Sequence, residues 1–115
     1  MRDLIVFCWV VALVAAGCRR EPSAADSVTI LQQVFSDTGA TPGVQLAIAA
    51  AQTNELGQGV IALQDAKHVP GLSAGQLQAV EQASQALTRE LLRRAEAGDA
   101  RAKADLELIE RSRSQ

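Results

Sequence analysis

The chain divides into two parts by the pattern of its hydrophobic and polar residues. Every residue from Leu4 to Ala16 is apolar. From position 28 onward, apolar residues recur three or four positions apart, which is the period of a helix with one buried face. We predict no strand in this part of the chain. The pattern predicts an apolar leader followed by an all-α domain.

Two helices are predicted in the first half of that domain, separated by the turn residues of SDTGATPG. Asp26 or Ser27 is the expected N-cap of the first helix. Its apolar positions are Val28, Leu31, Val34 and Phe35. Thr41 is the expected N-cap of the second helix, with Pro42 at the first helical position. Its apolar positions are Val44, Ala47, Ile48 and Ala51.

A third helix is predicted to start near Val60 and to run to Lys67. The segment NELGQG before it is expected to interrupt the helical pattern, because each glycine costs about 1 kcal/mol inside a helix. The segment HVPGLS after it contains Pro70 and Gly71, which favour a turn.

The fourth helix has the clearest pattern of the chain. Ser73 and Gln76 have the spacing of a capping box. The predicted core stripe is Leu77, Val80, Leu87 and Leu91. Residues expected on the other faces are Gln78, Gln82, Gln85, Arg89 and Arg93. Glu90 and Arg94 are four residues apart, so we expect them to form an ion pair along the helix.

A last helical segment is predicted from Ala100 to Ser112, after Gly98 and with Asp99 as N-cap. Gly98 fits either a sharp turn or a kink in a continuing helix. The residues expected on the inner side of this segment are Ala102, Leu106 and Ile109. The predicted surface ion pairs are Asp99–Lys103 and Glu107–Arg111.

Two helical hairpins follow from this order. The segments ELGQGVIAL and EAGDARAKADL each combine an acid, a glycine and a helix start, about 41 residues apart. This arrangement weakly resembles tetratricopeptide-type hairpins, which implies antiparallel helices that approach through small residues. Their usual repeat is about 34 residues, and the tryptophan and tyrosine positions of that family are empty here. An alanine-rich bundle without repeat ancestry is the alternative.

Composition limits what such a domain can be. A chain of 115 residues with net charge −2 allows one small domain and offers no basic surface for nucleic acid. Its aromatic residues are Phe7, Trp9 and Phe35, so only Phe35 is left once the leader is removed. We therefore predict a small alanine-rich bundle of antiparallel hairpins, held together by close helix contacts.

The leader has the three parts of an export signal: Arg2, the apolar run and a zone of small residues. The run is shorter than the roughly 20 residues that span a bilayer. The order Ala15-Ala16-Gly17-Cys18 resembles the lipobox of bacterial lipoproteins. That resemblance implies cleavage between Gly17 and Cys18, a diacylglyceryl group on the Cys18 thiol and acylation of the new amino terminus.

The predicted organisation is a signal peptide at 1–17, a lipidated cysteine with a polar tether at 18–26, and a helical domain at 27–115. Two alternatives stay open: an ordinary signal peptide that leaves Cys18 as a free thiol, and an uncleaved short anchor. Cysteine use favours lipidation, because Cys18 would be the only cysteine of the mature chain and could form no internal disulfide. Arg19 stands where inner-membrane retention in enteric bacteria commonly has aspartate, so the resemblance favours the periplasmic face of the outer membrane.

Catalytic chemistry is hard to build from the remaining residues. His68 is the only histidine, so we predict no metal site and no cofactor. No serine lies in a G-x-S-x-G sequence, and no glycine loop has the lysine that cradles phosphate. We therefore expect a lipoprotein that is not an enzyme, bound to the membrane by its anchor, with a protein or peptide partner and no nucleic acid. An architectural lipoprotein, whose helices self-associate or lie on the membrane, is the alternative.

Overall fold

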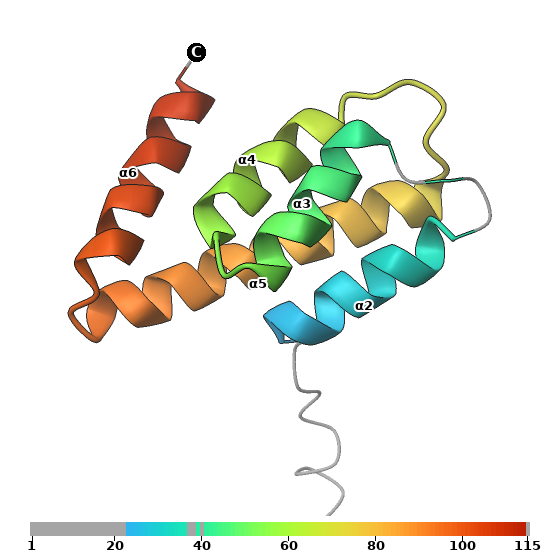
Figure 1. Ribbon diagram of the computed structural model, residues 1–115. Helices are drawn as coiled ribbons and strands as arrows, with labels where there is room; N and C mark the ends of the chain where they lie inside the picture. Colours follow the sequence, from blue (N-terminus) through green and yellow to red (C-terminus); the bar gives the residue numbers. More distant parts are fainter. Residues whose placement is uncertain (1–22, 37–38, 40, 115) are drawn as a thin grey trace, which may run out of the picture.

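The computed structural model describes residues 23–36, 39 and 41–114, and these residues form five α-helices (Figure 1). The helices are α2 (Ala24–Val34), α3 (Pro42–Gln52), α4 (Leu56–Ala66), α5 (Ala74–Glu96) and α6 (Ala100–Arg113). No strand occurs within these ranges. The all-α prediction is confirmed.

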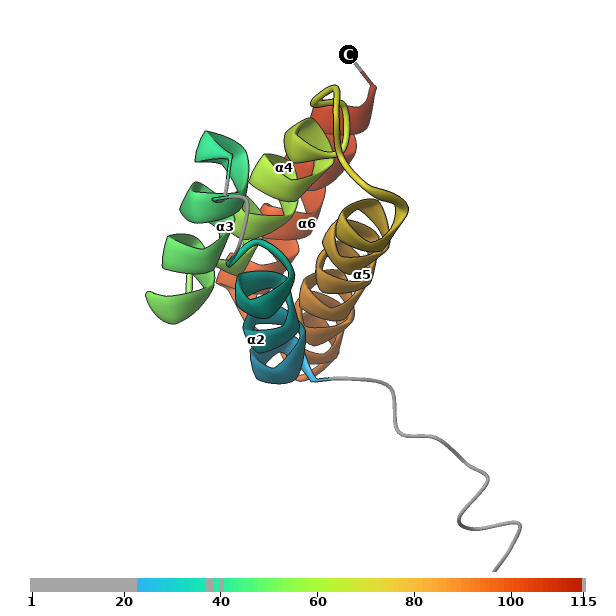
Figure 2. The ribbon, with the colours of Figure 1, turned by 90° about the vertical axis from the view of Figure 1, so that its right-hand side faces the viewer.

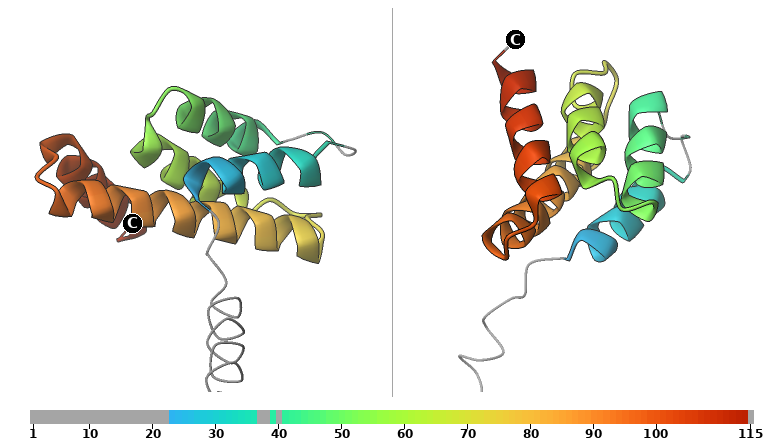
Figure 3. Two further views of the ribbon diagram at one scale, coloured as in Figure 1. Left: turned by 90° about the horizontal axis from the view of Figure 1, so that it is seen from below. Right: turned by 60° about the vertical axis from the view of Figure 1, so that its left-hand side comes forward.

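The helices are arranged in two layers. α3, α4 and α6 stand side by side, with α4 in the middle and in contact with both neighbours (Figure 3). α2 and α5 lie antiparallel beneath them, and α5 also contacts α4 and α6 (Figures 1 and 2). α4 and α5 therefore make contacts both within their own layer and between the two layers.

The two predicted hairpins close in different ways. α3 and α4 run antiparallel through the short turn at residues 53–55. α5 and α6 are joined at Gly98, whose φ of 98° lies in the left-handed region that glycine adopts without strain. α6 then rises steeply from the end of α5 and lies beside α4 (Figure 1). Gly98 is thus a sharp turn rather than a kink.

Three predicted N-caps are confirmed. The Thr41 hydroxyl accepts from the Val44 backbone N–H at 3.4 Å at the start of α3. At α5, the Ser73 hydroxyl accepts from the Gln76 backbone N–H at 3.1 Å, and the Gln76 side chain accepts from the Ser73 backbone N–H at 3.0 Å. The Asp99 carboxylate accepts two backbone N–H groups in the first turn of α6. These caps satisfy donors that the first helical turn leaves unpaired.

The predicted start of the first helix is wrong. α2 begins at Ala24, and Ser23 caps it by accepting from the Asp26 backbone N–H at 3.2 Å. Asp26 and Ser27 lie inside the first turn, and residues 24–26, predicted to belong to the tether, are helical. This earlier start places Ser27 among the buried residues, and its hydroxyl has no hydrogen-bond partner among the residues that the structure describes. Ser23, Asp26 and Ser27 are all good N-cap residue types, and packing of the helix rather than cap preference selected Ser23.

The predicted interruption at NELGQG is also wrong in its extent. α4 starts at Leu56, and Gly57 and Gly59 lie buried inside it. A Cβ atom on Gly57 would lie 2.7 Å from Asp105 Cγ of α6, and one on Gly59 would lie 3.1 Å from Leu87 Cδ1 of α5. The two glycines mark the places where α6 and α5 pass closest to α4.

The core is built from a few branched residues and many alanines. Its residues with no exposed surface include Leu31, Val44, Val60, Leu63, Ala83 and Leu87. The predicted stripe of α5 is buried at Val80, Leu87 and Leu91, but Leu77 is 41% exposed, which corrects that prediction. The buried face of α5 turns instead through Ala79, Ala83 and Ala86, because small side chains allow the neighbouring helices to approach.

Only part of the predicted surface pairing occurs. Glu90 and Arg94 form an ion pair, as predicted. Neither Asp99–Lys103 nor Glu107–Arg111 is among the ion pairs of the described residues. Asp99 uses its carboxylate for the cap of α6. Exposed ion pairs contribute little free energy, so spacing alone does not enforce them.

Candidate functional site

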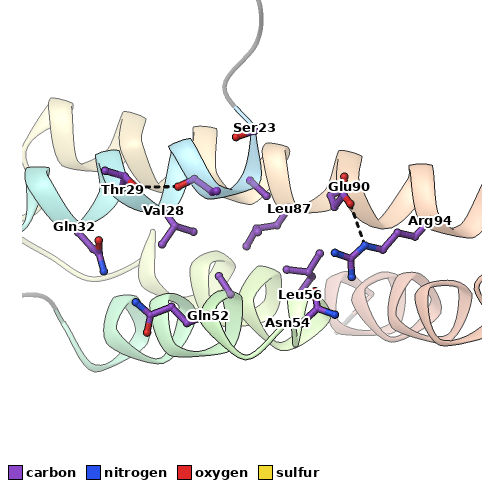
Figure 4. Close-up of a pocket in the computed structure, with 13 residues that line it drawn as sticks. Ser23, Val28, Thr29, Gln32, Gln52, Asn54, Leu56, Leu87, Glu90 and Arg94 are labelled. Carbon is purple, nitrogen blue, oxygen red and sulfur yellow. Dashed lines mark hydrogen bonds and ion pairs between the residues drawn. The ribbon is translucent and has the colours of Figure 1, made fainter.

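A cleft of about 510 Å³ opens between α2, the α3–α4 turn and α5 (Figure 4). Its residues come from segments that lie far apart in the sequence: 23–32, 51–56 and 87–94. One side of the cleft is α2, the other is the end of α3 with the turn and the start of α4, and α5 lies behind them. The cleft therefore exists only because the two layers meet there.

The floor of the cleft is apolar and belongs to the core. Val28, Leu56 and Leu87 line it and are 8%, 4% and 0% exposed. Ala51 lies partly buried beside them. Because these side chains are almost completely buried by packing on both layers, they fix the shape of the cleft but expose little apolar surface of their own.

The rim carries uncharged polar side chains. Gln32 extends from α2 and Gln52 from the end of α3, on opposite sides of the cleft (Figure 4). Asn54 stands at the α3–α4 turn with a φ of 64°, a conformation that asparagine tolerates better than most residues. Each of these carboxamides has both donors and an acceptor, which suits a neutral polar ligand such as a peptide backbone.

One end of the cleft is charged. Glu90 accepts from Arg93 through both of its carboxylate oxygens, and from Arg94 Nε at 3.0 Å through Oε1. Glu90 and Arg94 line the cleft, whereas Arg93 points to solvent with its side chain 67% exposed. The three side chains sum to one positive charge.

The electrostatics of this end follow from that geometry. The hydrogen bonds from Arg93 are the largest cause that lowers the pKa of Glu90 from 4.5 to about 2, and the bond from Arg94 adds to them. The same contact raises the pKa of Arg93. Glu90 is therefore ionised throughout the neutral range, and its carboxylate is a weaker base than an ordinary glutamate.

The arrangement is suited to binding. An apolar floor with carboxamides around it and an ion pair at one end can hold a peptide-like group and fix its orientation. None of the described residues that line the cleft is a histidine or a cysteine. Among the described residues, no group of three or more His, Cys, Asp or Glu side chains could hold a metal ion.

His68 lies away from the cleft. It is exposed in the turn after α4, beside a separate hollow that Asp65, Ser112 and Arg113 also line. No group of metal-binding side chains surrounds it among the described residues.

The predicted lipid-attachment and cleavage residues, Cys18 and Gly17, lie outside the described residues. Within the described ranges, no helix is long and apolar enough to cross a membrane. The first described residue, Ser23, caps α2 and also lines the cleft. The cleft thus opens at the end of the domain that is nearest to Cys18 along the chain.

Sequence reasoning did not single out Gln32, Gln52 or Asn54 as site residues. Polar residues at exposed helix positions are common, and only the meeting of α2 with the α3–α4 turn gives these three a shared role. The one local signal is asparagine in TNELG, since a turn that needs positive φ favours this residue.

Comparison with known proteins gives no relative: no family model, no curated protein and no solved structure matches this chain.

Proposed function

We propose that this protein is a small bacterial cell-envelope lipoprotein, anchored through Cys18, whose helical domain binds a protein or peptide partner in the cleft. The observation that carries the proposal is the position of the Ser23 cap. Cys18 and Ser23 are five residue steps apart, so the chain between them spans at most about 18 Å. A domain that starts so soon after the anchor holds its cleft close to the bilayer.

The sequence supports the anchoring part of the proposal. The apolar run, the Ala-Ala-Gly-Cys order and Arg19 favour a lipoprotein on the periplasmic face of the outer membrane. The cleft supports the binding part, because it is a hollow of about 510 Å³ with uncharged polar side chains at its rim. The proposal assigns the protein no catalytic role, no cofactor and no nucleic-acid partner.

Anchoring is tested by the intact mass of the protein from membranes. We expect a product that begins at Cys18 and carries the added mass of lipid. Cys18→Ser should accumulate as uncleaved precursor. If Cys18→Ser is exported, cleaved and released like the wild type, the anchor proposal is wrong.

Binding is tested by co-purification from detergent-solubilised membranes with a C-terminal tag. Gln32→Arg places a bulky charge in the cleft, whereas Gln33→Arg changes an exposed neighbour that does not line it. A partner retained by the wild type and by Gln33→Arg but lost from Gln32→Arg would support the cleft. Equal retention by both variants would exclude the cleft, and the absence of any partner after chemical cross-linking would contradict a binding function.

An architectural role is the second candidate. Its version with self-associating helices is favoured by one observation: α3 contains no charged residue, and its Leu46 is 57% exposed.

A further inference from the structure

Arg94 is the residue that can give the cleft a preference for one chemical group. Among the described residues that line the cleft, it alone carries a positive charge. Its side chain is 29% exposed and extends from α5 toward Asn54 at the α3–α4 turn (Figure 4). The guanidinium group therefore lies at one end of the cleft, within reach of a ligand.

The hydrogen bonding of Arg94 leaves its outer nitrogen atoms open. Its Nε donates to Glu90 Oε1 at 3.0 Å, which fixes the orientation of the guanidinium plane. No residue that the structure describes accepts from either Nη group of Arg94. These two groups carry most of the N–H donors of the side chain, and their planar fork matches the two oxygens of a carboxylate.

Glu90 does not cancel the charge at this end of the cleft. It also accepts from Arg93, at 3.0 Å from Nε to Oε2 and through a second bond to Oε1. One carboxylate is therefore shared by two guanidinium groups, and one positive charge is left over. Because the Arg93 side chain is 67% exposed and does not line the cleft, Arg94 is the residue that presents this charge to a ligand.

The space changes character beyond Arg94. A smaller hollow of about 170 Å³ begins there, and Arg94 and Asn54 line both spaces and so lie between them. Asp99 and Asp105 line the smaller hollow together with Arg101, and neither acid forms an ion pair with Arg94 among the described residues. Two carboxylates in so small a space disfavour the entry of another anion. An anionic group that reaches Arg94 from the cleft would therefore stop there, as the end of a chain does.

We infer that the cleft binds the C-terminal end of a peptide, with the terminal carboxylate held by the two Nη groups of Arg94. The inference rests on the proposed function of the cleft and adds the chemistry of its ligand. Asn54 lies beside the guanidinium, where its amide can donate to the same carboxylate. Gln32 and Gln52 lie further along the cleft on opposite sides, at the backbone of the preceding residues (Figure 4). Because the floor exposes little apolar surface, the terminal charge rather than an apolar side chain supplies the preference.

Peptide capture by the full-length chain, purified in detergent, tests the inference. Two mixtures of short acetylated peptides of random sequence are offered, which differ only in ending with a free carboxylate or with a carboxamide. The wild type should enrich the acid mixture by at least about tenfold over the amide mixture, because hydrogen bonds to a charged group are the stronger ones. Arg94→Gln should lose this preference. Arg89→Gln is the matched control and should keep it, because it removes the same charge from an exposed position of α5 outside the cleft.

Asn54→Asp is a second variant that changes the turn very little. Aspartate also tolerates positive φ, so the turn should be kept, and the new negative charge beside Arg94 should weaken capture of the acid mixture. Circular dichroism should show that all variants remain helical. If Arg94→Gln is not helical, Asn54→Asp decides the test.

The possible outcomes separate this inference from the proposed function. Equal enrichment of both mixtures overturns the inference but leaves peptide binding in place. Enrichment that requires an internal Asp or Glu in the peptide, whichever group ends it, also overturns the inference and assigns Arg94 to an acidic side chain. Enrichment of neither mixture contradicts the inference and peptide binding in the cleft together.

Discussion

α3 and α5 both bury one face in the same core, but their outer faces are of different kinds. α5 exposes glutamine and arginine, and its Glu90 pairs with Arg93 and Arg94 of the same helix. α3 exposes an apolar stripe without a single charge. A charged outer face shows from the sequence alone which side of a helix faces the core. α3 has no charge to mark its outer face, which carries only Gln45 and Gln52 as polar residues, yet the spacing of its apolar residues still predicted that Val44 and Ala47 face the core.

The largest expected difference between the two helices is the response of their leucines to truncation. Leu87 of α5 is completely buried and lies at the floor of the cleft. It packs against Gly59 of α4, where a Cβ atom would lie 3.1 Å from Leu87 Cδ1. Leu87→Ala should lower the free energy of unfolding by about 2–5 kcal/mol through lost burial and a residual cavity. A small domain has only about 5–15 kcal/mol in total, so urea denaturation should show a large shift of the midpoint.

Leu46 of α3 supplies the contrast. Measured at concentrations where the chain is monomeric, Leu46→Ala should change the unfolding free energy by less than about 0.5 kcal/mol, because Leu46 is already exposed. Gln85→Ala, on the outer face of α5, should behave in the same way. If Leu87→Ala and Leu46→Ala lowered the free energy of unfolding equally, this would contradict the structure, in which Leu87 is buried and Leu46 is exposed.

The second comparison uses one substitution at equivalent positions. Gly43 and Gly75 each occupy the second residue of their helix, α3 and α5. A Cβ on Gly75 would meet only Ser73 Oγ at 4.0 Å, so Gly75→Ala should stabilise the domain by about 0.5–1 kcal/mol. A Cβ on Gly43 would lie 3.3 Å from both Ala62 O and Ala66 Cβ of α4.

Gly43→Ala should therefore lose that gain and destabilise the domain by up to about 1 kcal/mol, since a helix carbonyl of α4 would have to move. Thermal or urea melts of the two variants would measure the difference directly. If both substitutions stabilise the domain equally, α3 does not approach α4 as closely as described.

Local signals were sufficient wherever one helix determines its own geometry. Thr41 with Pro42, Ser73 with Gln76, and Gly98 with Asp99 each carry their cap in adjacent residues, and the structure confirms all three. The all-α class was predictable for the same reason, because helical spacing recurs throughout the domain.

The predictions that failed concern positions whose role is set by contact with a second helix. Gly57 and Gly59 indicate a break when read locally, but they are the positions where α6 and α5 press against α4. The position of Leu77 on the periphery of α5 follows from the alanines that face its neighbours. The cleft could not be predicted either, because its rim comes from α2, the α3–α4 turn and α5, and no local pattern relates them.

The last predicted effect concerns the ion pairs that α5 has and α3 lacks. Because the folded-state pKa of Glu90, about 2, lies below its ordinary value of 4.5, its ionised form stabilises the fold. That contribution is complete above pH 4.5 and is lost as the pH falls toward 2. It should stay below about 1 kcal/mol, because Arg93 is 67% exposed and solvent screens the pair. Urea melts of wild type and Glu90→Gln should therefore differ slightly near neutral pH and converge as the pH is lowered, and added salt should narrow the gap. A difference that persists unchanged at the lowest pH would show that Glu90 acts through packing rather than charge.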